Sequence, residues 1–436
     1  MSVGNNNSLN ESLIPQKRII IDTDSGIDDI ISIIVSLKHD KSKLEAITVV
    51  EGNVTLKQGL LNLCSLLDVA SLRNRKIPIY PGCDKPIIQN FNKEKPYSSL
   101  SSFHNMNSYS LHERNLITNH IKKEHAVLAL IRMVTNEPNE FTIVCLGPLT
   151  NIALAIRLDP FFLSKVKNIV VMGGCLYAKG NSTRVAEYAF NFDPEAAHIV
   201  FTAAKQHTVD YPNSTQPKIT LVPWEVSVEQ SLDWKFYDYL INTPPVNELT
   251  HLMKEISTIK ELLFRKSHES IISRSVTNAF QDNKNNNNST ISFNNKENAN
   301  NNNNNNEIVA SIEDPLSIEA PVYTSNAVLQ YQINATKFIM SDLYTLVCAL
   351  EPESIIKEYQ DLDVDIELSG KYARGLTCID WLGSGQRTLN ARIILKVDKN
   401  EIKNILIQSF KQNTIPILQK APTTSEPLIV KLKSKL

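Results

Sequence analysis

The sequence predicts an α/β fold in which a mostly parallel central sheet is flanked by helices in an open, doubly wound arrangement. Short apolar runs alternate with helical patterns over most of the chain, an order that is typical of parallel sheets. The composition, with 42% hydrophobic and 21% charged residues, is that of an ordinary globular protein. The 436 residues allow two or three domains of about 150 residues, or one large domain with insertions.

The expected elements follow one another from residue 18 onward. Short apolar runs predict buried strands, and the longer segments between them carry a helical pattern. In chain order, the prediction is strand 18–22, helix 27–37, strand 45–50, helix 55–72, helix 126–134, strand 141–146, helix 149–157, strand 166–172, helix 194–204, an extended segment 219–222, helix 341–349, strands 363–368 and 391–397, and helix 400–410. Ligands of such sheets bind beyond the carboxyl ends of the strands, so motifs at those ends carry the most weight.

An asparagine-rich segment interrupts this alternation. Asparagine makes up 15 of the 26 residues from 282 to 307. Such a tract has too little apolar surface to offset the entropy lost on ordering, so we predict a disordered insertion at 267–312. A tolerated surface insertion is the simpler interpretation, since loop length costs little, and asparagine-driven self-association is the alternative. The polar tail 1–16 is also predicted to be disordered, which leaves a single domain at 17–436 around the insertion.

Charge and hydropathy exclude several classes of protein. The 45 Lys and Arg residues nearly balance the 46 Asp and Glu residues, so the overall charge predicts no nucleic-acid partner. No apolar run approaches the roughly 18–20 residues of a membrane span, so no membrane partner is expected. The six cysteines form no CxxC pair, which disfavours a zinc cluster, and scattered reduced thiols indicate an intracellular compartment. We therefore expect a cytoplasmic protein, with the nucleus left open.

The strongest local signal is the run Asp22-Thr-Asp-Ser-Gly-Ile-Asp-Asp29, where an apolar strand turns into a helix. Asp22 and Asp24 share one face if the strand continues that far. Asp28 and Asp29 fall in the first helical turn, where the helix dipole favours negative charge. Four like charges so close repel one another, and a divalent cation is the simplest remedy. Because the ligands are oxygens alone, Ca²⁺ or Mg²⁺ suits the cluster better than zinc.

Two other interpretations of this run exist. Two of the aspartates could cap the helix while the other two are solvated, but the clustering of four at one strand end makes this the weaker interpretation. Phosphatases of the haloacid-dehalogenase type also begin with a strand that ends in Asp-x-Asp, the first Asp being the nucleophile. Those motifs usually continue with Thr or Val where this chain has Gly26, and they lack the Asp-Asp pair that follows here.

Beyond this run, the chain resembles the inosine/uridine-preferring nucleoside hydrolases, whose hallmark is Asp-Thr-Asp-Pro-Gly-x-Asp-Asp after the first strand. Further motifs that match in order and spacing are Val50-Glu-Gly-Asn53, Ile77-Pro-Ile-Tyr-Pro-Gly82, Leu146-Gly-Pro-Leu-Thr-Asn-Ile-Ala-Leu-Ala155, Val171-Met-Gly-Gly174, Gly180-Asn181, Ala186-Glu187, Asp193-Pro-Glu-Ala-Ala197 and Ser341-Asp342. Pro223-Trp224-Glu225 resembles a less characterised, divergent eukaryotic branch. The resemblance implies a nucleoside hydrolase-like fold.

The resemblance implies a chemistry as well. Family members hydrolyse the N-glycosidic bond of ribonucleosides, such as uridine or a purine nucleoside, to ribose and free base with a bound Ca²⁺. Matched by position, the carboxylates of Asp24, Asp29 and Asp342 and the backbone carbonyl of Thr150 would hold the metal. The metal would activate and orient a water molecule. Asp24 would also be catalytic, as the general base that takes the proton of that water.

Substrate-binding residues are implied in the same way. Asp28, Asn53, Asn181 and Glu187 would hydrogen-bond the ribose hydroxyls, with Asp22 as support behind them. A site that requires the 2′-hydroxyl discriminates against deoxyribonucleosides, because buried polar groups that are left unpaired are costly.

Each implied role has a structural alternative. Asn53 could simply end its strand, and Asn181 could be a turn residue. Glu187 could be a surface charge. Thr150 and Asp342 could mark the N-termini of helices, and for Thr150 both interpretations can hold at once.

Several positions depart from the family pattern. Ser25 replaces the hallmark Pro, although either residue suits a turn. Where the family has Asn two residues after its Glu, this chain has Ala189, and Asn191 could compensate only if the backbone shifted. Many members carry a His near the leaving base, before the late Asp; Ser341 stands there and supplies no acidic proton near neutral pH. Of the family's His-Gly-x-x-Gly loop only His104 survives, and it is the candidate acid.

Two functions from different classes remain. The first is an active nucleoside hydrolase, that is, an N-ribohydrolase, which the intact metal carboxylates favour. The second is a catalytically impaired homologue that binds metal or ribose and has a regulatory or scaffold role, which Ala189 and Ser341 favour. The expected partner is a small-molecule ribonucleoside, and a homodimer or homotetramer is expected by analogy with related proteins.

Overall fold

The computed structural model describes residues 15–69, 72, 76–88, 118–214, 216–260, 337–383 and 388–411. The insertion predicted at 267–312, most of the predicted tail, and His104 lie outside the described residues. The described residues up to 259 and from 337 onward belong to one compact unit. The boundaries of the single domain at 17–436 stay a prediction.

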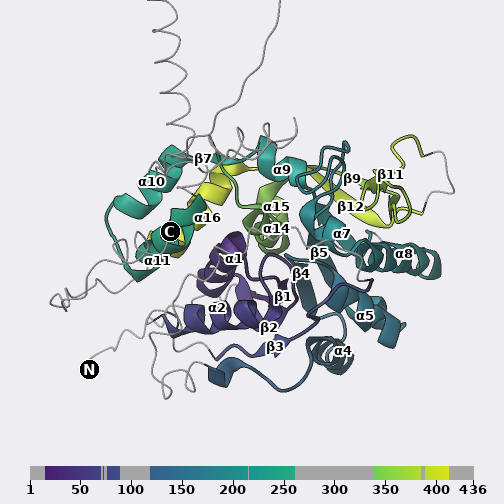
Figure 1. Cartoon of the computed structure of the whole chain (residues 1–436), viewed down its shortest axis with the longest axis horizontal. Helices are drawn as coiled ribbons and strands as arrows, with labels where there is room; N and C mark the ends of the chain where they lie inside the picture. The colour runs from purple at the N-terminus through teal and green to yellow at the C-terminus, as the bar shows by residue number, and fades with distance from the viewer. Residues whose placement is uncertain are drawn as a thin grey trace, which may run out of the picture. The chain divides into compact units, whose positions relative to one another are not determined.

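An eight-stranded sheet lies in this unit, in the order β3-β2-β1-β4-β5-β6-β12-β9 (Figure 1). Its strands are β1 Lys17–Thr23, β2 Ser42–Val49, β3 Ile79–Pro81, β4 Phe141–Cys145, β5 Asn168–Met172, β6 Ile219–Val222, β9 Ile356–Leu362 and β12 Ala391–Val397. All neighbouring pairs are parallel except β12 with β9, which are antiparallel. The mostly parallel sheet that the alternation predicts is therefore confirmed.

The order of the strands reverses beside β1. From β1 the chain first runs outward through β2 and β3, and it then returns to add β4 on the other side. The register aligns Asp22 with Thr48 of β2 and with Cys145 of β4. In open α/β sheets such a reversal leaves a crevice at the carboxyl ends of the strands, where ligands bind. The aspartate run that follows β1 lies at this point.

Helices pack on both faces of the sheet, as a doubly wound fold requires (Figure 1). Successive residues of β1 point to opposite faces: Ile19 and Ile21 belong to one apolar cluster, and Ile20 belongs to the other. The first cluster contains residues of α1 Ile27–Lys38, α2 Leu56–Asp68, α14 Ser341–Leu350 and α16 Lys399–Lys411. The second contains residues of α4 Ala126–Asn136, α5 Thr150–Leu158 and α8 Pro194–Asp210.

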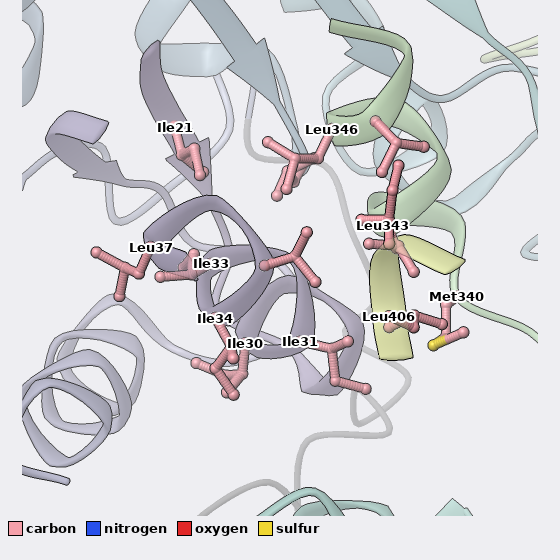
Figure 2. Packing of buried hydrophobic residues seen from close by; sticks show 14 of the residues in the cluster. Ile21, Ile30, Ile31, Ile33, Ile34, Leu37, Met340, Leu343, Leu346 and Leu406 are labelled. Atoms are coloured by element: carbon pink, nitrogen blue, oxygen red, sulfur yellow. The ribbon is translucent and has the colours of Figure 1, made fainter. Parts of the chain in front are cut away.

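The helix α1 joins the aspartate run to the first cluster. It begins after Gly26, and all its residues from Asp29 to Leu37 are buried. Figure 2 shows α1 side chains such as Ile31 facing Leu343 of α14 and Leu406 of α16. Full burial of each such side chain contributes roughly 1.5–3 kcal/mol. This packing holds the first turns of α1 and α14 in place.

The remaining described elements are η3 Thr118–His120, α6 Phe162–Lys165, α7 Tyr188–Phe192, α9 Trp224–Glu229, β7 Leu232–Asp233, α10 Trp234–Asn242, α11 Glu248–Lys260, β8 Lys337–Phe338, α15 Pro352–Ile355, β10 Val364–Ile366 and β11 Thr377–Ile379. None of the helices within the described ranges has the length and apolar character that a bilayer crossing requires.

The structure differs from the sequence prediction mainly at short or polar strands. The strand predicted at 363–368 is β10, which pairs with β11 in a separate antiparallel sheet. The sequence does not predict β9, because its middle residues are polar or exposed and its apolar pattern is weak. The helix predicted at 55–72 is shorter, since α2 ends at Asp68; Thr55 caps it by accepting the Gln58 N–H.

Candidate active site and metal centre

The aspartate run folds as a tight turn between β1 and α1. Ser25 has a φ of 58°, in the left-handed region that few residues other than glycine adopt. Its N–H donates to the Thr23 hydroxyl at 3.0 Å. Proline cannot adopt this conformation, because its ring holds φ near about −65° and it has no N–H. Ser25 and the hallmark proline are therefore not interchangeable in this backbone.

Three carboxylates meet where α1 and α14 begin. Asp28, Asp29 and Asp342 each place a carboxylate oxygen within 4.8 Å of the others. Asp29 and Asp342 are buried, whereas Asp28 is half-buried. Asp29 also accepts hydrogen bonds from the Thr23 hydroxyl and from the Gly26 N–H. The fold thus brings together acidic residues that are more than 300 positions apart in the sequence.

Asp24 is buried and is held by Asn53. The backbone N–H of Asn53 donates to Asp24 Oδ2 at 2.8 Å, and its side-chain amide donates to Oδ1 at 3.0 Å. Two glycines allow close approach: a Cβ at Gly52 would lie 2.2 Å from Asp24 Oδ2, and one at Gly147 would lie 2.9 Å from Asp24 Cβ. The backbone segments after β2 and β4 therefore close around Asp24.

Asp22, at the end of β1, joins this site to α5. The hydroxyl of Thr48 and the side-chain amide of Asn151 both donate to Asp22 Oδ1. The other oxygen, Oδ2, is buried and has no hydrogen-bond partner in the part of the chain that the structure describes. Burial raises the pKa of Asp22 to about 7, although the two donors oppose this shift.

The aspartates of this site are crowded and mostly buried, so each opposes the ionisation of its neighbours. Burial raises the pKa values of Asp24 and Asp342 well above their usual range, and the charge of Asp29 raises both further. Buried like charges are costly unless a cation compensates them. All the candidate metal ligands are oxygen atoms, which Ca²⁺ and Mg²⁺ prefer. The donor set therefore fits a divalent cation, and the cluster could hold one.

Thr150, the predicted carbonyl ligand, is buried as the first residue of α5. Its hydroxyl donates to Asp193 Oδ2 at 2.7 Å. The next residue, Asn151, bridges Asp22 and the chain after β3, where its Oδ1 accepts the Cys83 N–H at 2.9 Å. Thr150 therefore does lie at a helix N-terminus, and its neighbour contacts the aspartate at the end of β1.

Glu187 belongs to a second polar group, at the N-terminus of α7. Its Oε1 accepts the Ala189 N–H at 3.0 Å, and its Oε2 accepts the N–H groups of Phe190 and Gly174, each at 3.2 Å. Burial raises the pKa of Glu187 to about 7, although these donors oppose the shift. Glu187 is thus a buried helix cap, and the alternative of a surface charge does not hold.

Tyr188 is influenced electrostatically by both polar groups. Burial raises the pKa of its half-buried phenol, and the charges of Asp24, Glu187 and Glu51 raise it further. The hydroxyl therefore lies within electrostatic reach of both Asp24 and Glu187. The sequence analysis did not single out Tyr188; the available signal is its place directly after Glu187.

Two asparagines near α7 have different surroundings. The Oδ1 atom of Asn181 is buried and accepts no hydrogen bond within the described ranges. The side chain of Asn191 donates to the Ser182 hydroxyl at 3.0 Å. Residues two apart on a helix point in directions that differ by about 200°. Asn191 therefore does not lie on the face of α7 where Ala189 is buried. The ribose contact predicted for Asn191 stays a prediction.

Two further residues lie at element boundaries. Ser341 is the buried first residue of α14, directly before Asp342. Glu225 is buried at the start of α9, where its Oε1 accepts the N–H groups of Leu176 at 2.8 Å and Tyr177 at 3.1 Å. Its Oε2 is buried and has no partner among the residues described here. Only the Pro-Trp-Glu motif signalled Glu225 in the sequence.

Comparison with known proteins gives one family. The model of the family described as inosine-uridine preferring nucleoside hydrolase matches residues 19–404. The inosine-uridine preferring nucleoside hydrolase of Crithidia fasciculata is 38% identical over 194 residues, which are 44% of this chain and 59% of that protein. The pyrimidine-specific ribonucleoside hydrolase RihB of Escherichia coli (strain SE11) is 36% identical over 191 residues, 43% of this chain and 57% of that protein. The chain thus spans less than two thirds of the length of these curated relatives.

Solved structures share the fold. An inosine-guanosine nucleoside hydrolase, IG-NH, matches with a TM-score of 0.65 and 26% identity, covering 91% of this chain and 98% of that chain. The plant nucleoside hydrolase PpNRh1 matches with a TM-score of 0.61 and 22% identity, covering 91% and 99%. The second likeness is to the fold alone. Together with the sheet order, these matches confirm the predicted fold class.

Proposed function

The chain belongs to the inosine-uridine preferring nucleoside hydrolase family, and from this premise we propose that it is an enzyme that hydrolyses the N-glycosidic bond of ribonucleosides. The observation that carries the proposal is the buried carboxylate cluster at the reversal of strand order. Buried groups with strongly shifted pKa values gather at functional sites. The proposed substrate is uridine or a purine ribonucleoside, and the products are ribose and the free base.

We propose Ca²⁺ as the cofactor of this site. Asp24, Asp29 and Asp342 would contribute carboxylate oxygens, and Thr150 would contribute its backbone carbonyl. Ca²⁺ bound there would lower the pKa of a water molecule and orient it for attack. The clustering of Asp29 with Asp342 supports this proposal, as does the pKa of Asp24, which burial and the charge of Asp29 raise.

Asp24 would take the proton of the attacking water on one of its carboxylate oxygens. Asn53 orients both oxygens, and the close backbone at Gly52 and Gly147 leaves no room for another side chain there. A general base must lie within hydrogen-bond reach of the proton it takes, so a fixed orientation favours transfer.

The polar groups around this base would bind the sugar. Asp28, Asn53, Asn181 and Glu187 would hydrogen-bond the ribose hydroxyls. The buried Oδ1 of Asn181 is an open acceptor within the described ranges, which supports its role. The surrounding carboxylates would also stabilise the positive charge that develops on the sugar ring in the transition state.

Release of reducing sugar tests the proposed function. Purified full-length protein with Ca²⁺ is incubated with uridine, cytidine, inosine, adenosine, guanosine and nicotinamide riboside, and Asp24→Ala is the matched variant. Release by the parent and not by the variant supports the hydrolase and ranks its bases. Release by both proteins alike contradicts the role of Asp24.

The same assay tests the second candidate, a catalytically impaired homologue. Ala189 has no amide where the family has Asn, and Ser341 has no acidic proton where many members have His; both residues are buried, and these replacements favour this candidate. No release from any nucleoside, with Ca²⁺ binding demonstrated by calorimetry, would support it and contradict the hydrolase.

We also propose a cytoplasmic location and assembly as a homodimer or homotetramer. All six cysteines are unpaired, and five of them are buried; this supports a reducing compartment such as the cytoplasm. Light scattering of the purified protein would test the expected homodimer or homotetramer.

A further inference from the structure

The beginning of α5 is fixed in an unusual way. Its N-cap residue, Leu149, makes no side-chain capping bond, although Ser, Thr, Asp or Asn usually caps a helix N-terminus. Thr150, the first helical residue, instead donates its hydroxyl to Asp193 of another segment at 2.7 Å. The orientation of this N-terminus therefore depends on a side chain from outside the helix.

Asp193 joins three parts of the chain. It is fully buried, and its Oδ1 accepts the Ala196 N–H at 3.1 Å, which caps α8. Its Oδ2 accepts both the Thr150 hydroxyl and the Ile87 N–H, the latter at 3.0 Å. Three donors hold this carboxylate, so it is a well-fixed anchor for the Thr150 side chain.

Asn151, the next residue, is anchored as well. Its Nδ2 donates to Asp22 Oδ1 at 2.8 Å and to the Val49 carbonyl at 3.2 Å, and its Oδ1 accepts the Cys83 N–H at 2.9 Å. The carbonyl of Thr150 belongs to the peptide unit between Thr150 and Asn151, and this unit is planar. Because the residues on both sides are anchored, the direction of that carbonyl is fixed.

We propose that Asp193 is a positioning residue of the metal centre, which acts through the Thr150 hydroxyl to orient the Thr150 carbonyl toward the cation. The inference rests on the proposed function, in which this carbonyl is the ligand that is not a carboxylate. A carboxylate ligand can turn about its own side-chain bonds, but a backbone carbonyl moves only with its helix. Its orientation therefore has to come from the anchors of α5.

Calcium affinity of the full-length protein tests the inference. Thr150→Val removes the hydroxyl and keeps the carbonyl, whereas Thr150→Ser keeps both. Removal of outer-shell partners typically weakens metal binding by about 10–100-fold, so we expect Thr150→Val and Asp193→Ala to raise the Kd for Ca²⁺ within that range. Thr150→Ser should keep the parental Kd. The double variant should be no weaker than the more severe single variant, because both remove the same bond.

Thr250→Val is the matched control. Thr250 is a buried threonine in the first turn of α11, and its hydroxyl bonds to the backbone of Asn247. The Thr250→Val variant should lose stability in EDTA much as Thr150→Val does, yet keep the parental Kd for Ca²⁺. Europium luminescence lifetimes, measured in H₂O and in D₂O, add a direct readout: Thr150→Val should show more water bound to the ion, and Thr250→Val should not.

The outcomes separate the two proposals. A parental Kd and parental hydration in Thr150→Val overturn the role of Asp193, while Ca²⁺ binding and nucleoside hydrolysis by the parent still support the proposed function. A parent that binds no Ca²⁺ overturns the proposed metal site and this inference together.

Discussion

Each carboxylate oxygen of Asp24 accepts one hydrogen bond from Asn53, Oδ2 from the backbone N–H at 2.8 Å and Oδ1 from the side-chain amide at 3.0 Å. The two residues follow the neighbouring parallel strands β1 and β2, whose register aligns Thr23 with Val49. The sheet therefore brings the pair together. An asparagine that merely ended its strand would have no need to hold both oxygens of a buried carboxylate.

Replacing Asn53 with alanine removes the side-chain donor and keeps the backbone donor. A hydrogen bond to a charged group is worth about 1.5–3 kcal/mol, so kcat/KM should fall roughly ten- to a hundredfold. The side-chain amide of Asn53 stabilises the charged form of Asp24, so its removal raises the pKa of Asp24. The acid limb of the profile of kcat/KM against pH should then move to higher pH.

Asn404→Ala is the control for this variant, because Asn404 donates to Glu401 on the exposed surface of α16. It should keep both the parental rate and the parental profile. An unchanged acid limb in Asn53→Ala, despite a slower rate, would contradict Asp24 as the general base.

Removal of the metal should expose the repulsion within the carboxylate cluster. Asp342→Asn replaces a buried carboxyl group, whose charged form Asp28 and Asp29 repel, with an amide that carries no charge. Charges at such distances repel by on the order of a few kcal/mol at an effective dielectric constant of about 20. In EDTA, the variant should therefore unfold at higher urea concentration than the parent.

With saturating Ca²⁺ the order of stability should reverse. The variant has lost a metal ligand, so Ca²⁺ binding stabilises it less than it stabilises the parent. Urea unfolding of both proteins, in EDTA and in saturating Ca²⁺, shows whether the order of stability reverses. If Asp342→Asn is the less stable protein even in EDTA, repulsion is not what dominates this cluster.

Glu187 should make the metal-free protein less stable as the pH rises. Its pKa is about 7 in the folded protein, against an ordinary value of 4.5. Between these values the folded state binds the proton more tightly than the unfolded state, so the free energy of unfolding falls with rising pH. The full loss, present above about pH 7, corresponds to roughly 3 kcal/mol.

Glu187→Gln isolates this contribution, because every other titrating group remains. In EDTA, the free energy of unfolding should fall less in the variant than in the parent between about pH 4.5 and 7, by roughly 3 kcal/mol. Urea unfolding at several pH values measures the difference. Equal pH dependence in both proteins would falsify the assignment of Glu187 as a buried carboxylate of raised pKa.

The fold could be predicted to the extent that its signals are local. The alternation near β1 and α1 depends on neighbouring residues, so both elements lie close to the predicted ranges. Strand β9 could not be predicted in this way, because an exposed edge strand needs no apolar alternation. The order of the strands is a tertiary property that local patterns do not contain, and it comes from the structure alone.

The residues of the candidate site also divide into those that a local pattern predicts and those that only distant contacts bring together. The density of aspartates in one turn marks Asp24, Asp28 and Asp29 without any structure. Asp342 comes from a distant helix, and the resemblance alone placed it with them before the structure did. Asp193 belongs to a matching motif, but the sequence could not show its bond to Thr150, because that contact joins the starts of two helices.

The turn at Ser25 is where this structure disagrees most with the family hallmark. Ser25→Pro would restore the hallmark, yet the φ of 58° and the bond from the Ser25 N–H to Thr23 exclude proline. We expect Ser25→Pro to cost about 3 kcal/mol or more. Ser25→Gly should be neutral or stabilising, because left-handed backbone costs about 1–2 kcal/mol for other residues and because the Ser25 hydroxyl is buried without a partner within the described ranges.

Urea unfolding and Ca²⁺ titration of the two variants decide the matter. Ser25→Pro should also weaken Ca²⁺ binding, since the turn sets the spacing between Asp24 and Asp29, whereas Ser25→Gly should bind as the parent does. A proline variant with parental stability and affinity would show that the turn takes a proline-compatible form in solution. The replacement of the hallmark proline would then be neutral, and Ser25 would have no part in shaping the metal centre.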